Sequence, residues 1–141
     1  MAEATDRQSN GEQWTIEQVA NEVYKAFQDW RGIRTVATIM AESGGWTWIR
    51  PMVISPTSPA HLSTDRGICQ WNSYWWSSVP DIIAFEPVAA IARMCDEVTT
   101  DSWEIDLDPW HGSKSDNFYA FLPAARAAIN VLREAAGLKP V

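Results

Sequence analysis

Apolar residues recur at helical spacing in four stretches of the chain. The clearest stretch is 15–30, "TIEQVANEVYKAFQDW", where apolar side chains follow the i, i+3, i+4, i+7 pattern of an amphipathic helix. Thr15 and Gln18 stand three residues apart and match the capping box that begins a helix. The other predicted helices cover residues 34–43, 86–100 and 116–137.

Glycine and proline indicate where these helices begin and end. Gly44 suits the left-handed residue that follows the second helix, and Pro87 suits the first turn of the third. Pro123 would be costly inside a helix, so we expect a short turn first and a main helix that starts near Pro123. Gly137 is expected to end that helix.

Residues 45–66 are rich in Pro, Gly, Ser and Thr and predict irregular structure, with a possible short strand at "MVI" (52–54). Residues 1–13 are almost wholly polar and predict a flexible N-terminal arm. The pattern therefore predicts a mainly α fold with little or no β-sheet, formed by one domain over residues 14–141.

The charge balance argues against nucleic acid as a partner. The net charge is −7, and the 11 Lys and Arg residues are scattered along the sequence, whereas phosphate binding depends on clustered basic residues. No stretch reaches the roughly 18 to 20 apolar residues of a membrane span. No signal peptide is visible, so we expect neither membrane insertion nor an export signal within this chain.

Neither a metal site nor a cofactor site is expected from the sequence. Cys69 and Cys95 could form one disulfide or remain two free thiols, and the apolar face of 86–100 places Cys95 on its buried side. The two histidines are fifty residues apart, and no CxxC motif is present. The Asp-rich segment 101–110 lacks the ligand spacing of a calcium loop and predicts a solvated loop.

Nine tryptophans in 141 residues are unusual. Trp14 and Trp30 fit helix packing, whereas the others lie in or beside segments rich in Gly, Pro and Asp. These others either fill a small core or line a groove in which flat indole faces stack on sugar rings. They are Trp46, Trp48, Trp71, Trp75, Trp76, Trp103 and Trp110.

Glu42 stands at the end of the predicted helix 34–43, where a basic residue would suit the helix dipole better. It lies at the edge of the buried stripe, so partial burial and the dipole both disfavour its charged form. A protonated carboxyl group is what a general acid needs to protonate a glycosidic oxygen. Gly44 and Gly45 are expected to leave the adjacent backbone open to a polymer. The alternative is an ordinary solvated glutamate.

A second segment carries candidate chemistry: "STDRGICQWNSYWW", residues 63–76. Gly67 allows a tight turn, and Gln70 and Asn72 offer donors and acceptors for sugar hydroxyl and acetamido groups. The alternative is a turn with packing aromatics.

Together, "AESGG" (41–45) and "DRGICQWN" (65–72) resemble the lysozyme-like family of goose-type lysozymes and soluble lytic transglycosylases. That family includes phage wall hydrolases and actinobacterial resuscitation-promoting factors, and the resemblance covers roughly residues 30–130. It implies a lysozyme-like domain with a glycan-binding cleft. Two departures stand out: Ile68 and Cys69 replace the more usual apolar pair, and the transglycosylases' Ala-Tyr-Asn motif has no clear match.

The resemblance implies that Glu42 is the catalytic acid, that Ser43 shapes the site, and that Gln70 lies at the floor of the cleft. Asp65 is our first candidate for a second carboxylate, because it lies just before Gly67, and Asp106 and Asp108 are weaker ones. The further residues expected to contact glycan are Trp46, Trp71, Asn72 and Trp110.

We therefore expect a muramidase or lytic transglycosylase that cuts the MurNAc-β-1,4-GlcNAc bond of peptidoglycan. The alternative is a non-catalytic glycan-binding or structural virion module of the same fold, and chitin is a less favoured substrate. The expected setting is a phage virion, tail or endolysin component delivered to the bacterial cell wall.

Overall fold

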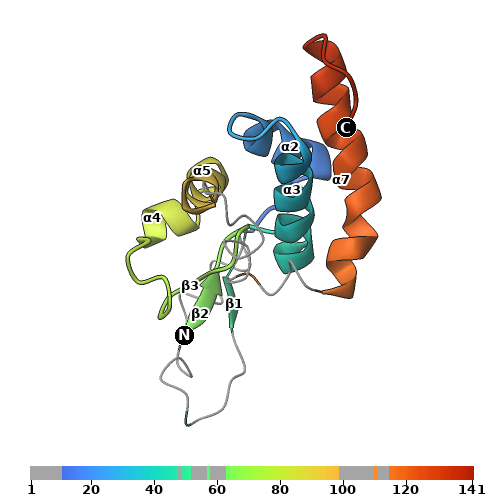
Figure 1. Cartoon of the computed structure of the whole chain (residues 1–141). Coiled ribbons are helices and arrows are strands. Elements are labelled where there is room, and N and C mark those ends of the chain that lie inside the picture. Colours follow the sequence, from blue (N-terminus) through green and yellow to red (C-terminus); the bar gives the residue numbers. More distant parts are fainter. Residues whose placement is uncertain (1–10, 48, 52–56, 58–62, 99–109, 111–114) are drawn as a thin grey trace.

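The structure is a computed structural model that describes residues 11–47, 49–51, 57, 63–98, 110 and 115–141 (Figure 1). Within these residues the fold is mainly helical, as predicted, with one small sheet. The main helices are α2 (Ile16–Tyr24), α3 (Trp30–Ser43), α5 (Pro87–Glu97) and α7 (Asp116–Ala135), and α4 is a single turn (Asp81–Ala84). The strands are β1 (Ile49–Pro51), β2 (Thr64–Arg66) and β3 (Trp71–Asn72).

The helices lie on two sides of the molecule. In Figure 1, α2, α3 and α7 pack together, with α7 extending beyond the other two, and the sheet lies on the other side of α3 with α4 and α5. The sheet is antiparallel in the order β1-β2-β3, and Asp65 of β2 pairs with Asn72 of β3. A contact between α2 and α5 joins the two sides.

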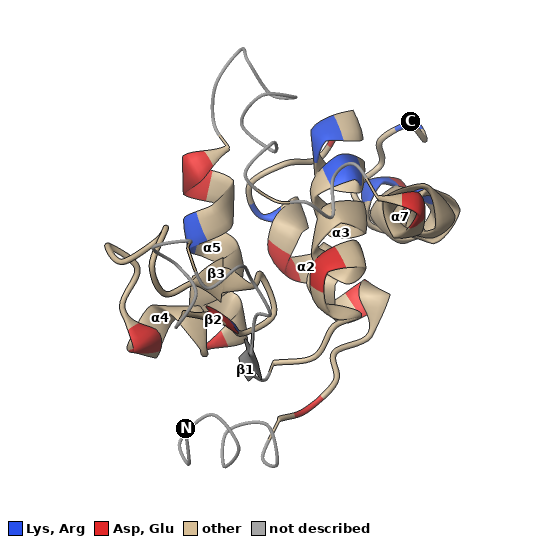
Figure 2. Cartoon of the chain, turned by 90° about the horizontal axis from the view of Figure 1, so that it is seen from below, with Lys and Arg blue, Asp and Glu red and all other residues tan. Residues whose placement is uncertain are grey.

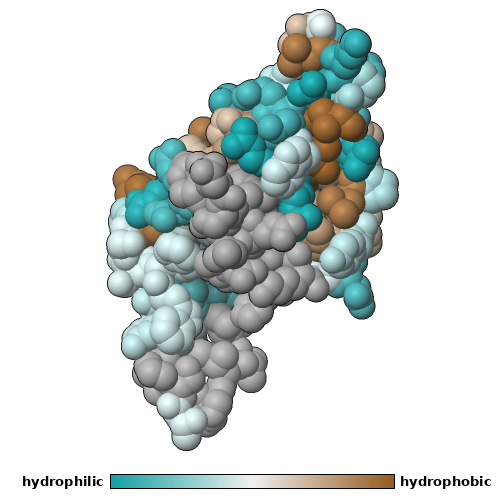
Figure 3. Space-filling view, viewed as in Figure 1, coloured by the Kyte–Doolittle hydropathy of each residue, from teal (hydrophilic) through white to brown (hydrophobic). Residues whose placement is uncertain are grey.

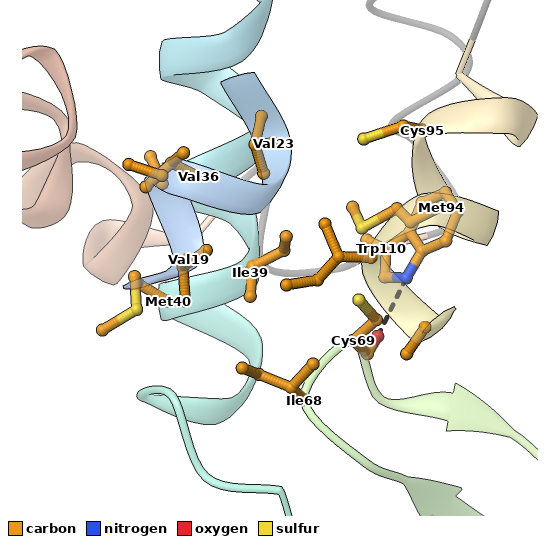
Figure 4. Packing of buried hydrophobic residues seen from close by; sticks show 14 of the residues in the cluster. Val19, Val23, Val36, Ile39, Met40, Ile68, Cys69, Met94, Cys95 and Trp110 are labelled. Atoms are coloured by element: carbon orange, nitrogen blue, oxygen red, sulfur yellow. Dashed lines mark hydrogen bonds between the residues drawn. The ribbon is translucent and has the colours of Figure 1, made fainter. Parts of the chain in front are cut away.

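The core lies between these two groups of elements. Figure 4 shows Val19 of α2 and Ile39 of α3 on one side, with Ile68 and Met94 on the opposite side. These side chains are all at most 1% exposed, so the turn after β2 is buried against the end of α3. The hydrophobic effect therefore joins two segments that the sequence separates by about 25 residues.

α2 ends earlier than the predicted residue 30, and α3 starts earlier than the predicted residue 34. α2 ends at Tyr24, and Asp29 caps α3 by accepting the Arg31 amide hydrogen at 3.0 Å. Gly32 therefore lies inside α3, where an added Cβ would stand 2.5 Å from the Phe27 carbonyl oxygen. The expected start at residue 34 is wrong because this glycine serves helix packing and does not break the helix.

The last helix also differs from the prediction. α7 runs without a break from Asp116 to Ala135 and contains Pro123, so the expected start near Pro123 is wrong. Pro123 is exposed, while Phe118 and Ala125 on either side of it are buried. Burial on both sides holds the helix together across the proline, and the backbone carbonyl that the ring leaves unbonded can face water.

The capping predictions are confirmed. Thr15 and Gln18 form a complete capping box, Pro87 occupies the first turn of α5, and Gly44 adopts a left-handed φ of 64° after α3. Cys95 is buried, and both cysteines are free thiols. The segment expected as a strand at 52–54 lies outside the described residues, as do residues 1–10 of the predicted arm.

Candidate functional site

Ser43 stabilises the C-terminal end of α3 with its side chain. Its hydroxyl donates to the Ile39 carbonyl at 3.1 Å and accepts the Gly45 amide hydrogen at 3.1 Å. The Gly44 amide donates to the Met40 carbonyl at 2.7 Å, which satisfies a further carbonyl of the last turn. Ser43 is buried, so its role in this structure is to shape the turn that directly follows Glu42.

The backbone beside Gly45 is not open, contrary to our expectation. Gly45 has a φ of 89°, and an added Cβ would stand 2.2 Å from the Trp14 carbonyl oxygen. The Trp14 amide donates to the Gly45 carbonyl at 2.8 Å, and the Gln13 side chain donates to the Gly44 carbonyl at 3.0 Å. The glycine therefore admits a neighbouring protein segment, and that segment covers the place where we expected a polymer.

This covering segment also fixes Trp46. Gln13 and Trp46 form an isolated antiparallel bridge, and the Thr47 amide donates to the Glu12 carbonyl at 3.0 Å. Residues 11–13, which the sequence assigns to a flexible arm, thus belong to the described structure and pair with it. Trp46 is half-buried, so part of its indole surface is open to solvent next to the end of α3.

The second candidate segment forms a strained turn between β2 and β3. Gly67 has a φ of 71°, and an added Cβ would stand 1.8 Å from the Ala84 carbonyl oxygen. Gln70 adopts a left-handed φ of 57°, which is uncommon for a residue with a side chain. Its side-chain amide donates to the Gly67 carbonyl at 2.8 Å, and its backbone amide donates to the same oxygen at 3.1 Å. Such local strain often accompanies functional sites.

Glu42 and this turn are brought together by the fold. The pKa of the Cys69 thiol is raised by burial, then by the negative charge of Cys95, and then by that of Glu42. The geometry agrees: Ile39, one turn before Glu42 in α3, and Ile68, two residues before Gln70, are buried in the same core cluster, so this part of α3 packs against the turn. Glu42 itself is half-buried, as its place at the edge of the apolar stripe predicts.

Asp65 lies in β2 and is half-buried. The Asn72 side-chain amide donates to Asp65 at 3.2 Å and to the Ser63 hydroxyl at 2.9 Å. The Asn72 side-chain oxygen accepts the backbone amides of Tyr74 and Trp75 at 2.9 and 3.0 Å. Asn72 is buried and acts as a structural junction between Asp65 and the loop after β3.

Two of the expected glycan contacts, Trp71 and Trp110, belong to the core. They are 0% and 3% exposed, and their rings pack edge to face with centroids 5.2 Å apart. Trp76 stacks on Trp110 at 5.5 Å, and the Trp110 indole N–H donates to the Cys69 carbonyl at 3.0 Å (Figure 4). The core-filling explanation therefore holds for these two tryptophans, because their faces are occupied by each other and by Trp76.

Arg66 is a residue that sequence reasoning missed. It is 4% exposed, and its guanidinium donates to the carbonyls of Trp71, Trp76 and Val79 at 2.9, 3.2 and 2.8 Å. It also pairs with Asp81 at 3.0 Å. Its place directly before Gly67 was the only available signal, and nothing in the sequence indicated that the chain would fold around it.

Trp48, Trp103, Asp106 and Asp108 lie outside the described residues. Within the described ranges, no three His, Cys, Asp or Glu side chains gather as a metal site would require. The helices among those residues are also too short or too polar to cross a bilayer.

The site thus combines a half-buried carboxylate at a helix end with a glutamine held in a strained turn. Comparison with known proteins adds no assignment: no family model matches the chain, and neither a curated protein nor a solved structure matches it.

Proposed function

We propose that the protein cleaves the β-1,4 bond between N-acetylmuramic acid and N-acetylglucosamine in peptidoglycan, with Glu42 as the general acid. The observation that carries the proposal is the packing of α3, which bears Glu42, against the turn that bears Gln70: Ile39 of α3 and Ile68 of the turn are buried in the same core. The two short motifs that resemble the lysozyme-like family thus come from different elements that pack against each other. Sequence order alone does not require this, because about 25 residues separate them.

The chemistry follows from the two groups. Glu42 donates its proton to the leaving glycosidic oxygen, the bond from the anomeric carbon to that oxygen breaks, and an oxocarbenium-like centre develops on the muramoyl ring. Gln70 would shape the floor of the site, with its left-handed backbone presenting the turn to the sugar.

Two fates of the sugar cation are compatible with this arrangement. In hydrolysis, a second carboxylate activates water on the opposite face, and inverting pairs stand about 6.5 to 9.5 Å apart. Asp65 is the candidate for that role. In transglycosylation, the muramoyl 6-hydroxyl attacks the anomeric carbon, Glu42 takes up its proton, and a 1,6-anhydro end results. The missing Ala-Tyr-Asn motif favours hydrolysis.

The Glu42→Gln variant tests the catalytic role. We expect its release of soluble fragments from purified cell walls to fall by about 10² to 10⁴-fold, the usual contribution of general acid catalysis. Glu134→Gln is the matched control, because Glu134 is an exposed glutamate near the C-terminal end of α7, outside the site, and its activity should be unchanged. Equal fragment release by Glu42→Gln and the wild type would show that Glu42 is not the acid.

Mass spectrometry of the released muropeptides separates the two fates. A reducing end indicates hydrolysis, and an anhydro end indicates transglycosylation. Asp65→Asn should then abolish hydrolysis and leave an anhydro-forming enzyme unaffected. If neither the wild type nor any variant releases fragments while the protein still binds cell walls, the non-catalytic module is the correct function.

The setting that we propose is delivery to the bacterial wall as part of a phage virion, tail or lysis apparatus. The net charge of −7 supports delivery by a larger assembly. A freely diffusing acidic domain would be repelled by anionic wall polymers within about one Debye length, roughly 8 to 10 Å at physiological salt.

A further inference from the structure

The loop after β3 presents two aromatic side chains to solvent. Tyr74 is 46% exposed and Trp75 is 63% exposed, and their rings meet edge to face with centroids 4.7 Å apart. Among the described residues, neither the Tyr74 hydroxyl nor the Trp75 indole N–H has a hydrogen-bond partner. Two large rings with free polar groups are thus available to a ligand.

Hydrogen bonds from two buried side chains hold the backbone that carries these rings. Asn72 accepts the amide hydrogens of both Tyr74 and Trp75, and the Trp76 amide donates to the Asn72 carbonyl at 2.9 Å. The buried Arg66 guanidinium holds the carbonyls of Trp76 and Val79. A loop fixed in this way loses little conformational entropy when it binds a ligand.

The surroundings of the two rings are polar but uncharged. Residues 72–80 read "NSYWWSSVP", with three serines and no charged side chain, and the nearby Asp81 is paired with Arg66. In Figure 2 this loop, between β3 and α4, is tan, and Lys and Arg are spread over α3, α5 and α7. The loop therefore carries no cation for a phosphate or carboxylate and suits a neutral ligand rich in hydroxyl groups.

We propose that Tyr74 and Trp75 form a carbohydrate-binding platform for N-acetylhexosamine rings of the glycan strand. The choice of glycan rests on the proposed function. The C–H face of a pyranose packs on an indole face, and the Tyr74 hydroxyl and Trp75 N–H bond to its polar edge. Asn72 joins the platform to Asp65 through one side chain, so the platform would extend the candidate site along the strand.

A membrane surface is the rival ligand, because exposed Trp and Tyr also favour the lipid interface. Binding at such a surface usually relies on Lys and Arg to attract anionic lipid headgroups. Here the loop has none and the chain carries a net charge of −7. The lack of cations on the loop and the negative net charge favour a glycan over a membrane surface as the ligand.

The test measures binding separately from cleavage by using the Glu42→Gln protein as the parent. Trp75→Ala is added to it, and Ile82→Ala serves as the control, because Ile82 is 82% exposed and lies nearby on α4. Calorimetric titration with a chitohexaose and cosedimentation with purified peptidoglycan report glycan binding. We expect Trp75→Ala to weaken both by about tenfold, and Ile82→Ala to leave both unchanged.

Each outcome decides the proposal. Equal glycan binding by the parent and Trp75→Ala overturns it, as does a parent that binds neither glycan. Binding to phosphatidylcholine vesicles that depends on Trp75, with glycan binding unchanged, overturns it in favour of a lipid surface. Trp75-dependent glycan binding by a protein whose wild type releases no wall fragments keeps the platform and refutes catalysis.

Discussion

Gly67 lies where the turn between β2 and β3 passes the end of α4. The position combines a left-handed φ of 71° with an approach to the Ala84 carbonyl so close that no Cβ fits. Gln70, three residues on, is also left-handed and is bonded to the Gly67 carbonyl. The shape of the candidate site thus depends on one residue without a side chain.

Gly67→Ala should therefore lower the free energy of unfolding by more than about 3 kcal/mol, because backbone strain of about 1 to 2 kcal/mol adds to the clash. Urea denaturation measures the change. Gly137→Ala is the control: its φ is 77°, but nothing lies within 4 Å of an added Cβ, so only the strain of about 1 kcal/mol applies. Equal losses for the two variants would contradict the steric argument.

The two thiols should make stability depend on alkaline pH. Burial and the Asp96 charge raise the pKa of Cys95 from 9.0 to about 12, and burial raises that of Cys69 as well. A group whose pKa is raised by folding stabilises the fold below its unfolded pKa. This contribution is lost as pH rises from about 9 towards the folded value of about 12.

We expect the free energy of unfolding to fall between about pH 9 and pH 11, and to fall less steeply in Cys95→Ser, which does not titrate there. Urea unfolding across this range measures both slopes. In the native protein, neither thiol should react with iodoacetamide near pH 8, since thiolate is the reactive form. Rapid alkylation without unfolding would contradict the burial of these residues.

At the scale of elements, Pro87 and Pro123 both lie inside described helices but occupy very different positions. Pro87 is in the first turn of α5, where its missing N–H costs nothing. Pro123 lies in the middle of α7, where it removes a backbone hydrogen bond and crowds the preceding turn. The same residue type therefore favours one helix and strains the other.

Pro123→Ala should raise the free energy of unfolding by about 2 kcal/mol. The gain of about 3 kcal/mol in the helix is offset by about 1 kcal/mol from the more flexible unfolded chain. Pro87→Ala should be neutral or slightly destabilising. Chemical denaturation of both variants measures the difference, and a loss of stability in Pro123→Ala would show that the proline is needed for the path of α7.

At the scale of the whole molecule, Arg133 ties three segments together. From α7 its guanidinium donates to the Lys139 carbonyl at 2.7 Å and to the Gln28 carbonyl at 2.6 Å, which is 105 residues away in sequence. Beyond it, the Val141 amide donates to the Asn130 side chain at 2.8 Å. Residues 138–141 thus fold back along the projecting half of α7, on which Figure 3 also shows apolar residues at the surface.

Arg133→Ala should lower the free energy of unfolding by about 1 to 2 kcal/mol, since two hydrogen bonds to a charged group are lost at a partly exposed position. Hydrogen exchange should also become faster at the Leu138 and Val141 amides. Arg126→Ala is the control, because Arg126 makes one longer bond of 3.4 Å to the Val141 carbonyl. Unchanged exchange in Arg133→Ala would show that the fold-back does not depend on it.

Local features of the chain were predictable because they depend on neighbouring residues. The capping box at Thr15, the left-handed Gly44 and Pro87 in the first turn follow from backbone geometry within a few residues. The mainly helical class followed from the period of the apolar residues. Glu42 at the edge of the buried stripe was predictable for the same reason.

What the sequence did not reveal depends on segments that meet only after folding. The break before α3 was misplaced because Gly32 makes room for the Phe27 carbonyl, a contact that the local pattern does not encode. Gly45 looked open from the sequence, but the backbone at Trp14 covers it. From the sequence, Trp71 and Trp110 could fill a core or line a groove, and only their mutual packing in the fold assigns them to the core.

The sequence by itself thus determined the helical class, the helix caps and the two motifs that nominate Glu42 and Gln70. Only the tertiary structure decided that α3 packs against the turn that bears Gln70, that Arg66 anchors the loop after β3, and that this loop exposes Tyr74 and Trp75 side by side. The physical reason is the sequence separation over which each kind of interaction acts. Capping and periodicity act within a turn or two of helix, whereas burial depends on which distant segments exclude water together.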